Sequence, residues 1–347
     1  MKKKNVIGLL ASNGTTFSLP SKTITIKTEK DVFGLLEYFP EIALICSIKP
    51  LLFKSKSPNN LMTFDWITIA RLISTNQNDL TGFVLINDLA TIIQTASALS
   101  FLLSHFNKPV VCTGLNKLED DNKLPSNSLI KSEFLGTKAN LINAFQVATM
   151  PNCEVSLMFG NQLIRANRAF RSTENTISAF SCLRMEALGK IDFGIKLNEN
   201  SLRQKPGTKI IPDFDDRVQV VYLYPGMSTN LLFSQTSANT KALIIQSAGA
   251  PLAASYFNEL SSIAKSGRRL VFRDILFDLT MKNSLQNKFA QENLEIATIN
   301  NMTLESTIIK TMLALAQTKT FAEFNEFLDR DLAGEIAPVA AKTEVML

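Results

Sequence analysis

Short runs of β-branched and aliphatic residues alternate with longer segments of helical periodicity, and this alternation constrains the fold more than any other feature. Parallel strands must be joined by a crossover of a dozen or more residues, usually a helix, so the pattern predicts an α/β protein. Ligand-binding loops are expected at the carboxyl ends of the strands. In the first half we expect strands over 6–11, 82–86 and 109–112 and helices over 63–74, 90–104 and 137–149.

The length of 347 residues and the 46% apolar composition predict two domains, because single hydrophobic cores stop growing near this size. Residues 189–216 are rich in Gly, Pro and charge and lack sustained periodicity. We therefore expect an N-terminal domain over 1–188, a linker over 189–216 and a smaller C-terminal α/β domain over 217–347. In the latter, strands are expected over 218–223, 242–246 and 270–272, and a helix over 256–264.

Charge and hydropathy exclude several classes of partner. The net charge of +5 comes from 36 basic and 31 acidic residues without a strong local excess, so nucleic-acid binding is not expected. The apolar run over 6–11 is short and meets a polar turn, as a buried strand would and a signal peptide would not. Asn87, Asp88 and Gln94 interrupt the most hydrophobic region, which predicts a soluble, cytoplasmic protein without a membrane partner.

The four cysteines lie far apart and mostly in apolar segments, without the spacing of a zinc site or of a disulfide framework. They are expected to be buried free thiols, and no metal or other cofactor is expected. The single histidine, His105, excludes a His-based triad or cluster and is expected to be structural.

Several separated blocks occur in an order that resembles the asparaginase/glutaminase family, specifically its cytoplasmic type I branch. The resemblance covers nearly the whole chain and implies that family's two-domain fold, with a larger, mostly parallel N-terminal sheet and a smaller C-terminal α/β domain. It also implies a homodimer or homotetramer. The blocks are Ser12–Thr16, Thr63–Trp66, Gly82–Phe101, Asn161–Arg168, Tyr224–Gly226, Asn301–Glu305 and Asp331–Glu335.

The resemblance also implies a catalytic apparatus that this sequence only partly keeps. In the family, two threonines at strand ends attack or position a side-chain amide, helped by an aspartate, a lysine and a lid tyrosine. Thr15 matches the first threonine, and a hydroxyl needs a neighbouring base to become a good nucleophile. Leu89 and Ala90 stand at the second threonine and its aspartate, and neither transfers protons. Arg171 stands at the lysine, and its guanidinium cannot supply a neutral amine.

The positions expected to contact a substrate have changed as well. Asn87 and Asp88 replace a His-Gly pair, and Asn59 and Asn60 lie in the segment that holds the substrate carboxylate in the family. These side chains are predicted substrate contacts with altered donor geometry. The lid segment over 16–28 contains no tyrosine.

We therefore expect a catalytically impaired asparaginase-like protein that retains an amide or amino-acid pocket. Two alternatives stay open: an active amidohydrolase with an altered substrate or mechanism, and a structural subunit that assembles with an intact relative. Two local interpretations also stay open. Leu89 and Ala90 can be packing residues beside a displaced alignment that recruits Asp88, and Thr15 can simply bond the backbone of its own turn.

Overall fold

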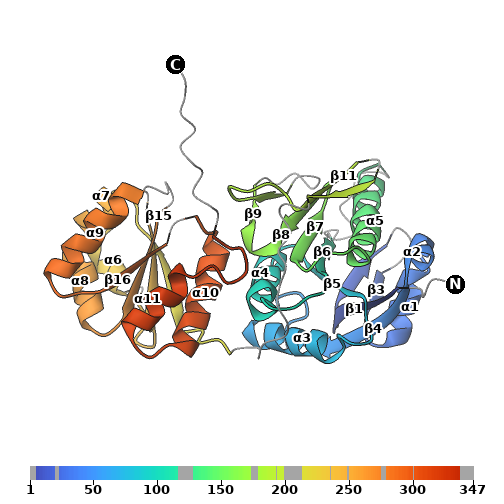
Figure 1. Ribbon diagram of the computed structural model, residues 1–347, viewed down its shortest axis with the longest axis horizontal. Coiled ribbons are helices and arrows are strands. Elements are labelled where there is room, and N and C mark those ends of the chain that lie inside the picture. The colour runs from blue at the N-terminus through green and yellow to red at the C-terminus, as the bar shows by residue number, and fades with distance from the viewer. Residues whose placement is uncertain are drawn as a thin grey trace, which may run out of the picture. The chain divides into compact units, whose positions relative to one another are not determined.

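The computed structural model describes residues 5–19, 23–115, 128–172, 179–192, 194–198, 213–234, 236–247, 250–274, 279–299 and 301–336. The chain divides into two compact units, Met1–Ile211 and Pro212–Leu347. Figure 1 shows the helices and strands of each unit.

The first unit is built on an eight-stranded sheet of order β12-β11-β8-β7-β6-β5-β1-β4. Strands β4, β1, β5, β6 and β7 pair in parallel, whereas β8, β11 and β12 add antiparallel pairs at one side. The strands are β1 Val6–Asn13, β4 Ser47–Lys54, β5 Gly82–Asp88, β6 Val110–Leu115, β7 Val155–Phe159, β8 Gln162–Arg165, β11 Gly189–Ile191 and β12 Ile195–Leu197. Two hairpins lie outside it: β2 Thr16–Ser18 with β3 Thr23–Thr25, and β9 Ala169–Arg171 with β10 Phe180–Cys182.

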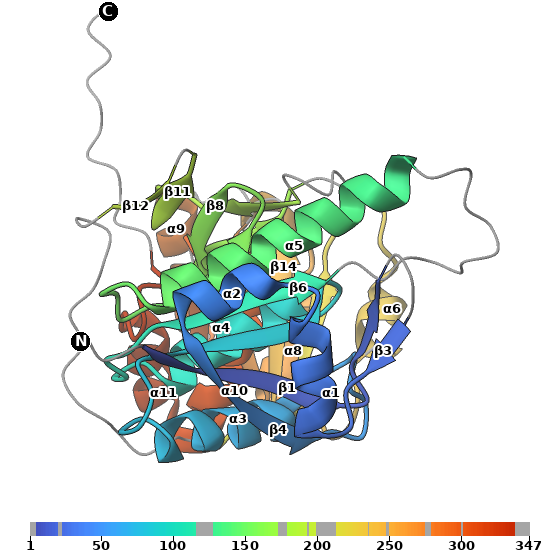
Figure 2. The same ribbon diagram turned by 90° about the vertical axis from the view of Figure 1, so that its right-hand side faces the viewer.

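Helices cover both faces of this sheet, which explains why its central strands are nearly continuous runs of apolar residues. In β1, for example, Ile7 and Leu10 are both fully buried although they point to opposite faces. Helices α1, α2 and α5 pack on one face, and α3 and α4 lie on the other (Figure 1 and Figure 2). Their bounds are α1 Glu29–Leu36, α2 Pro40–Ile45, α3 Thr63–Thr75, α4 Ile92–Leu102 and α5 Ser128–Ala148.

The second unit is a four-stranded parallel sheet of order β13-β14-β15-β16. One of its cores joins the sheet to α7, α8 and α9, and the other joins it to α10 and α11. The elements are β13 Val218–Tyr222, α6 Thr229–Ser234, β14 Ala242–Ser247, α7 Ala250–Ser255, α8 Phe257–Lys265, β15 Arg269–Asp274, α9 Leu279–Gln291, β16 Ile296–Ile299, α10 Leu304–Gln317 and α11 Phe321–Asp329.

These two sheets confirm the predicted α/β class with a larger, mostly parallel N-terminal sheet and a smaller C-terminal one. Some element boundaries differ from the expected ones. Strands β1 and β5 each continue two residues beyond the expected run, and α4 begins at Ile92 instead of residue 90. Residues 189–191 and 195–197, at the start of the expected linker, are strands of the first sheet, and 199–212 lie outside the described residues.

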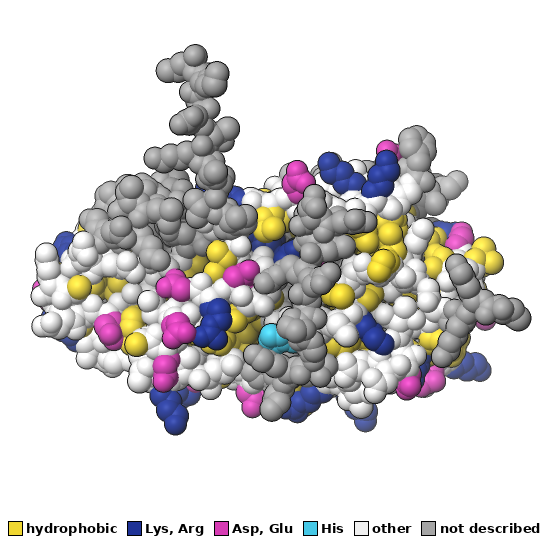
Figure 3. Space-filling view, in the orientation of Figure 1, with side chains coloured by type: hydrophobic (Ala, Val, Ile, Leu, Met, Phe, Trp, Pro, Cys, Tyr) yellow, Lys and Arg dark blue, Asp and Glu magenta, His cyan; other side chains and the backbone are white. Residues whose placement is uncertain are grey.

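Two other features of the sequence can be compared with the structure. Each cysteine is a free thiol, but only Cys46 and Cys112 are buried, whereas Cys153 and Cys182 are half-buried, so the expectation of four buried thiols was wrong. Within the described ranges, no helix has both the length and the apolar character needed to cross a bilayer. Basic and acidic side chains are interspersed on the face shown in Figure 3.

Candidate active site

The candidate site lies at the carboxyl edge of the first sheet, where parallel strands release the loops that carry the predicted residues. The registers pair Asn13 of β1 with Lys54 of β4, and Asp88 of β5 with Leu115 of β6. Because β1 and β5 are direct neighbours, the loops that follow them leave the same edge of the sheet. Thr15 lies on the first of these loops.

Thr15 sits in a tight turn that closes onto the segment after β3. Gly14 adopts a φ of +98°, a backbone conformation that favours glycine, and its N–H donates to the Ile26 carbonyl at 2.7 Å. The Ile26 N–H donates back to the Thr15 carbonyl at 2.8 Å. The Thr15 side chain is 7% exposed. Among the described residues, no group forms a hydrogen bond with its hydroxyl.

Leu89 fills the space above the end of β6. A Cβ placed on Gly114 would come within 2.0 Å of Leu89 Cδ2 and 2.8 Å of Leu89 Cγ. The leucine side chain therefore rests directly on the glycine backbone, and hydrocarbon occupies the position predicted to correspond to a catalytic hydroxyl.

Ala90 is exposed and belongs to a turn organised by Asp88. The Ala90 N–H donates to Asp88 Oδ1 at 2.9 Å, and the Thr91 N–H donates to the Asp88 carbonyl at 3.2 Å. This Asx-type turn delays the helix, which is why α4 starts at Ile92. One oxygen of the Asp88 carboxylate is thus engaged in shaping the loop.

Asn87 is 3% exposed and connects the strand end to α4. Its Nδ2 donates to Thr95 Oγ1 at 3.0 Å, and its Oδ1 accepts the N–H of Asp88 at 2.8 Å. Thr95, itself fully buried, also accepts a hydrogen bond from Trp66 Nε1 at 3.2 Å. Asn87 was predicted as a substrate contact, and these bonds give it a structural role at the base of the site.

The segment that carries Asn59 and Asn60 packs beside both loops. Pro58 lies against Gly14, where an added Cβ would meet Pro58 Cγ at 2.8 Å. The Thr91 hydroxyl donates to the Asn59 carbonyl at 3.4 Å, and the Asn60 N–H donates to the Ser57 carbonyl at 2.9 Å. Asn60 is exposed and Asn59 is half-buried. The hydrogen bonds that shape this turn involve their backbone groups.

Arg171 comes from β9 and reaches the loop after β5. Its Nη2 donates to the Leu89 carbonyl at 3.0 Å, and its guanidinium lies 5.4 Å from the centre of the Phe180 ring. The structure therefore brings Arg171 to the same loop as Leu89 and Ala90. There the arginine acts as a hydrogen-bond donor to the backbone.

The preceding Asn167-Arg168 pair belongs to a fully buried 3-10 turn, Ala166–Arg168. Arg168 donates to the Leu183 carbonyl, and Arg165 lies 3.4 Å from the buried carboxylate of Glu154. These buried cations hold β8 and β9 in place. The Asn-Arg pattern is therefore part of a buried structural element that precedes Arg171.

The residues that sequence reasoning missed are Thr95 and Gly114. Thr95 lies eight positions after Asn87 and meets it only because the chain reverses from β5 into α4. Gly114 meets Leu89 only through the register of β5 with β6. Neither residue carries a local sequence signal for these contacts.

Comparison with known proteins decides the family. The family model described as "Asparaginase, N-terminal" matches residues 6–203, more than half of the chain. The chain belongs to the asparaginase family.

Similar asparaginases and a related amidotransferase component extend the match beyond that region. L-asparaginase 1 of Escherichia coli K12 is 29% identical over 287 residues, which cover 79% of this chain and 80% of that protein. A glutamyl-tRNA(Gln) amidotransferase subunit of Pyrococcus furiosus is 24% identical over 361 residues, 97% of this chain and 78% of that protein. The crystal structure of L-asparaginase I from Vibrio cholerae superimposes with a TM-score of 0.76 at 24% identity, covering 97% of this chain and 100% of the other.

Membership in the asparaginase family allows the loops at this edge of the sheet to be compared with the catalytic loops of that family. The glycine turn that carries Thr15 and the strand ends that carry the second loop are in place. Around them stand a leucine side chain, an alanine and an arginine bonded to the backbone. The arrangement can present hydrogen-bond donors to a ligand, but these three side chains cannot relay a proton.

Proposed function

We propose that this asparaginase-family protein is catalytically impaired and retains a site for a small amide or amino acid near Thr15. The observation that carries the proposal is the contact between Leu89 and Gly114. A side chain that fills this space is compatible with the fold and offers neither a nucleophile nor a proton acceptor.

The surroundings of Thr15 support the same conclusion. A hydroxyl that attacks an acyl group needs a base at hydrogen-bond distance, about 2.6 to 3.2 Å from the hydroxyl oxygen. Among the described residues no such hydrogen bond to the Thr15 hydroxyl exists. The guanidinium of Arg171 can attract an anionic group but has no atom that accepts a proton.

Restoring the missing groups tests this proposal. The triple variant Leu89→Thr, Ala90→Asp and Arg171→Lys should gain ammonia release from asparagine or glutamine, whereas each single variant should gain little, because such groups act as a unit. Threonine is smaller than leucine at position 89, so it relieves the contact with Gly114 instead of adding to it.

A matched control separates chemistry from packing. The triple variant Leu89→Val, Ala90→Asn and Arg171→Gln makes similar changes in size but supplies no hydroxyl, carboxylate or amine. A gain confined to the first triple supports the proposal. Substantial ammonia release by the parent, equal to that of the restored protein, would contradict it, since the parent would then already possess a working relay.

Retention of a ligand is tested separately by calorimetry with asparagine, aspartate and glutamine. Measurable binding that Thr15→Val weakens supports an amino-acid site. Binding that is insensitive to Thr15→Val would place the ligand elsewhere and contradict this part of the proposal.

A further inference from the structure

A pocket lies at the antiparallel side of the first sheet. Its volume is about 530 Å³, within the range typical of small-molecule sites. The lining comes from the start of β8, from strands β11 and β12, and from β10 and the segment that follows it. Its polar members are Gln162, Ser181, Glu186, Lys190, Lys196 and Asn198.

Two lysines face each other in this pocket. The register of β11 with β12 places Lys190 directly opposite Lys196, and the register of β11 with β8 places Lys190 opposite Gln162. Residues directly opposite in antiparallel strands project from the same face of the sheet. The three side chains therefore form one row across three strands, and all three line the pocket.

Like charges in such a pair destabilise the sheet unless something neutralises them. Within the part of the chain that the structure describes, neither lysine forms an ion pair. Glu186 is the acidic member of the lining, and its Oε2 accepts a hydrogen bond from Asn198 Nδ2 at 2.9 Å. Among the described residues, the row thus presents two positive charges without a bonded carboxylate.

Protection of a sheet edge is a common reason for a strand lysine, and it accounts for Lys196 because β12 ends the sheet. It does not account for Lys190, because β11 is paired on both sides, with β8 and with β12. An edge lysine also gains nothing from a second lysine placed directly opposite. Figure 3 shows basic side chains, with acidic ones beside them, along the part of the surface where β11 lies in Figure 1.

We propose that this pocket binds a small dianion, a phosphate monoester or a dicarboxylate, whose charges lie between Lys190 and Lys196. Ammonium groups bind both kinds of anion as point charges. Gln162, Ser181 and Asn198 supply neutral donors around them, and the volume accommodates an organic body larger than the anionic group itself. The pocket shares no residue with the candidate active site, so the proposal of a dianion site does not depend on the proposed function.

Cys182 provides a reporter for occupancy. It lines the same pocket and is half-buried, and burial raises the pKa of its thiol, which predicts slow alkylation. In a Cys153→Ser background, Cys182 is the one cysteine that is not fully buried. A bound dianion should slow its alkylation further, because it covers the pocket.

The test is calorimetry of the full chain with phosphate, glycerol phosphate and succinate at constant ionic strength, with neutral succinamide as the uncharged control. We expect binding of the dianions, no binding of succinamide, and at least tenfold weaker affinity in Lys190→Gln and in Lys196→Gln. Lys30→Gln, which removes an exposed lysine from α1, is the matched charge control and should bind as the parent does. The stronger of the phosphate and succinate series identifies the class of ligand.

Thermal unfolding gives a second readout, in which the parent and Lys196→Gln should rank differently without and with the ligand. Without a ligand, Lys196→Gln should be as stable as the parent or more stable, because it removes a like-charge pair. With the dianion, the parent should gain stability and Lys196→Gln should not. The proposal is overturned if no dianion binds the parent, if binding survives both lysine substitutions, or if the ligand leaves the alkylation of Cys182 unchanged.

Discussion

At the scale of single residues, Leu89 and Gly114 decide what the second loop can do. The contact makes Gly114→Ala an overpacking substitution, since the new Cβ would meet Leu89 Cδ2 at 2.0 Å. We expect it to lower the free energy of unfolding by about 1 to 3 kcal/mol in urea denaturation. Combining it with Leu89→Ala should recover part of that loss through the shared contact.

Gly34→Ala in α1 is the control for this measurement, because nothing lies within 4 Å of the added Cβ. That substitution should stabilise the protein by about 0.5 to 1 kcal/mol, as expected for glycine in a helix. A neutral effect of Gly114→Ala would show that Leu89 does not occupy the space above the glycine.

A second residue-scale prediction concerns the buried hydrogen bonds below the site. Thr95→Val removes the oxygen that accepts from both Asn87 Nδ2 and Trp66 Nε1. Leaving buried donors unpaired costs about 1 to 3 kcal/mol for each group, so we expect a loss in that range or above in chemical denaturation. Thr75→Val, at an exposed position of α3, should change stability by less than about 0.5 kcal/mol. Similar effects at the two positions would contradict the role assigned to Thr95.

At the scale of elements, the hydrophobic pattern predicted the central strands, because strands buried on both faces are continuous runs of apolar residues. Val84 and Leu85 are fully buried, so their run is readable without knowing the partners of β5. The hairpin of β11 and β12 lies where the composition predicts a linker. Strands that carry lysines and are only three residues long have the composition of a loop, so the pairing of β11 and β12 could not be read from the sequence.

The helix α10 is fixed by a buried ion pair, which gives an element-scale prediction. Lys310 and Glu335 are both 0% exposed and 2.6 Å apart, and Glu335 also accepts the N–H groups of Leu332 and Ala333. Glu335→Gln should cost about 3 to 5 kcal/mol, because it leaves the buried ammonium without its counter-charge. Glu292→Gln breaks the exposed pair with Lys265 and should cost less than about 1 kcal/mol in the same thermal unfolding assay. Comparable losses would contradict the importance of burial.

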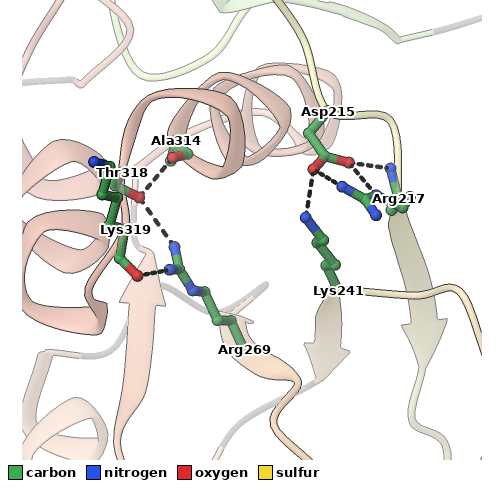
Figure 4. Close-up of polar contacts among 7 residues, drawn as sticks. All are labelled: Asp215, Arg217, Lys241, Arg269, Ala314, Thr318 and Lys319. Carbon is green, nitrogen blue, oxygen red and sulfur yellow. Dashed lines mark hydrogen bonds and ion pairs between the residues drawn. The ribbon is translucent and has the colours of Figure 1, made fainter.

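Asp215, which lies just before β13, should make stability depend on pH. Asp215 accepts from Arg217 on both oxygens and from Lys241 at 3.2 Å (Figure 4). These hydrogen bonds, that with Arg217 first, hold the pKa of Asp215 below its ordinary value of 3.8. Because the folded-state pKa is lowered, this stabilisation is present above pH 3.8 and is lost as the pH falls below it.

Asp215→Asn should therefore lower stability at pH 7 by about 0.5 to 1 kcal/mol, a modest amount because both cationic partners are half exposed and screened by solvent. Urea denaturation from pH 7 down to pH 2 should show a constant difference between the parent and the variant above about pH 4, and a shrinking difference below it as Asp215 becomes protonated in the unfolded chain. A difference that stays constant over this range would contradict the assignment.

At the scale of the whole molecule, the order of the sequence blocks predicted the family and the fold, and the family model and the superposition on an asparaginase confirm both. The candidate site was only partly predictable. The structure places Arg171 at the loop of Leu89. The sequence could not show that Asn87 faces inward to Thr95, because that contact depends on the turn between β5 and α4. Assembly into a homodimer or homotetramer stays a prediction, which light scattering of the purified chain would test.

The central claim is that this asparaginase scaffold lacks the groups that pass protons to and from Thr15. Its most direct test is the rate of ammonia release by the purified parent protein with saturating asparagine or glutamine. Losses in a cooperative catalytic set lower turnover by about three to six orders of magnitude, so we expect a rate at least about 1,000-fold below the ~10 per second of a typical enzyme. Turnover within about tenfold of that value would contradict the account.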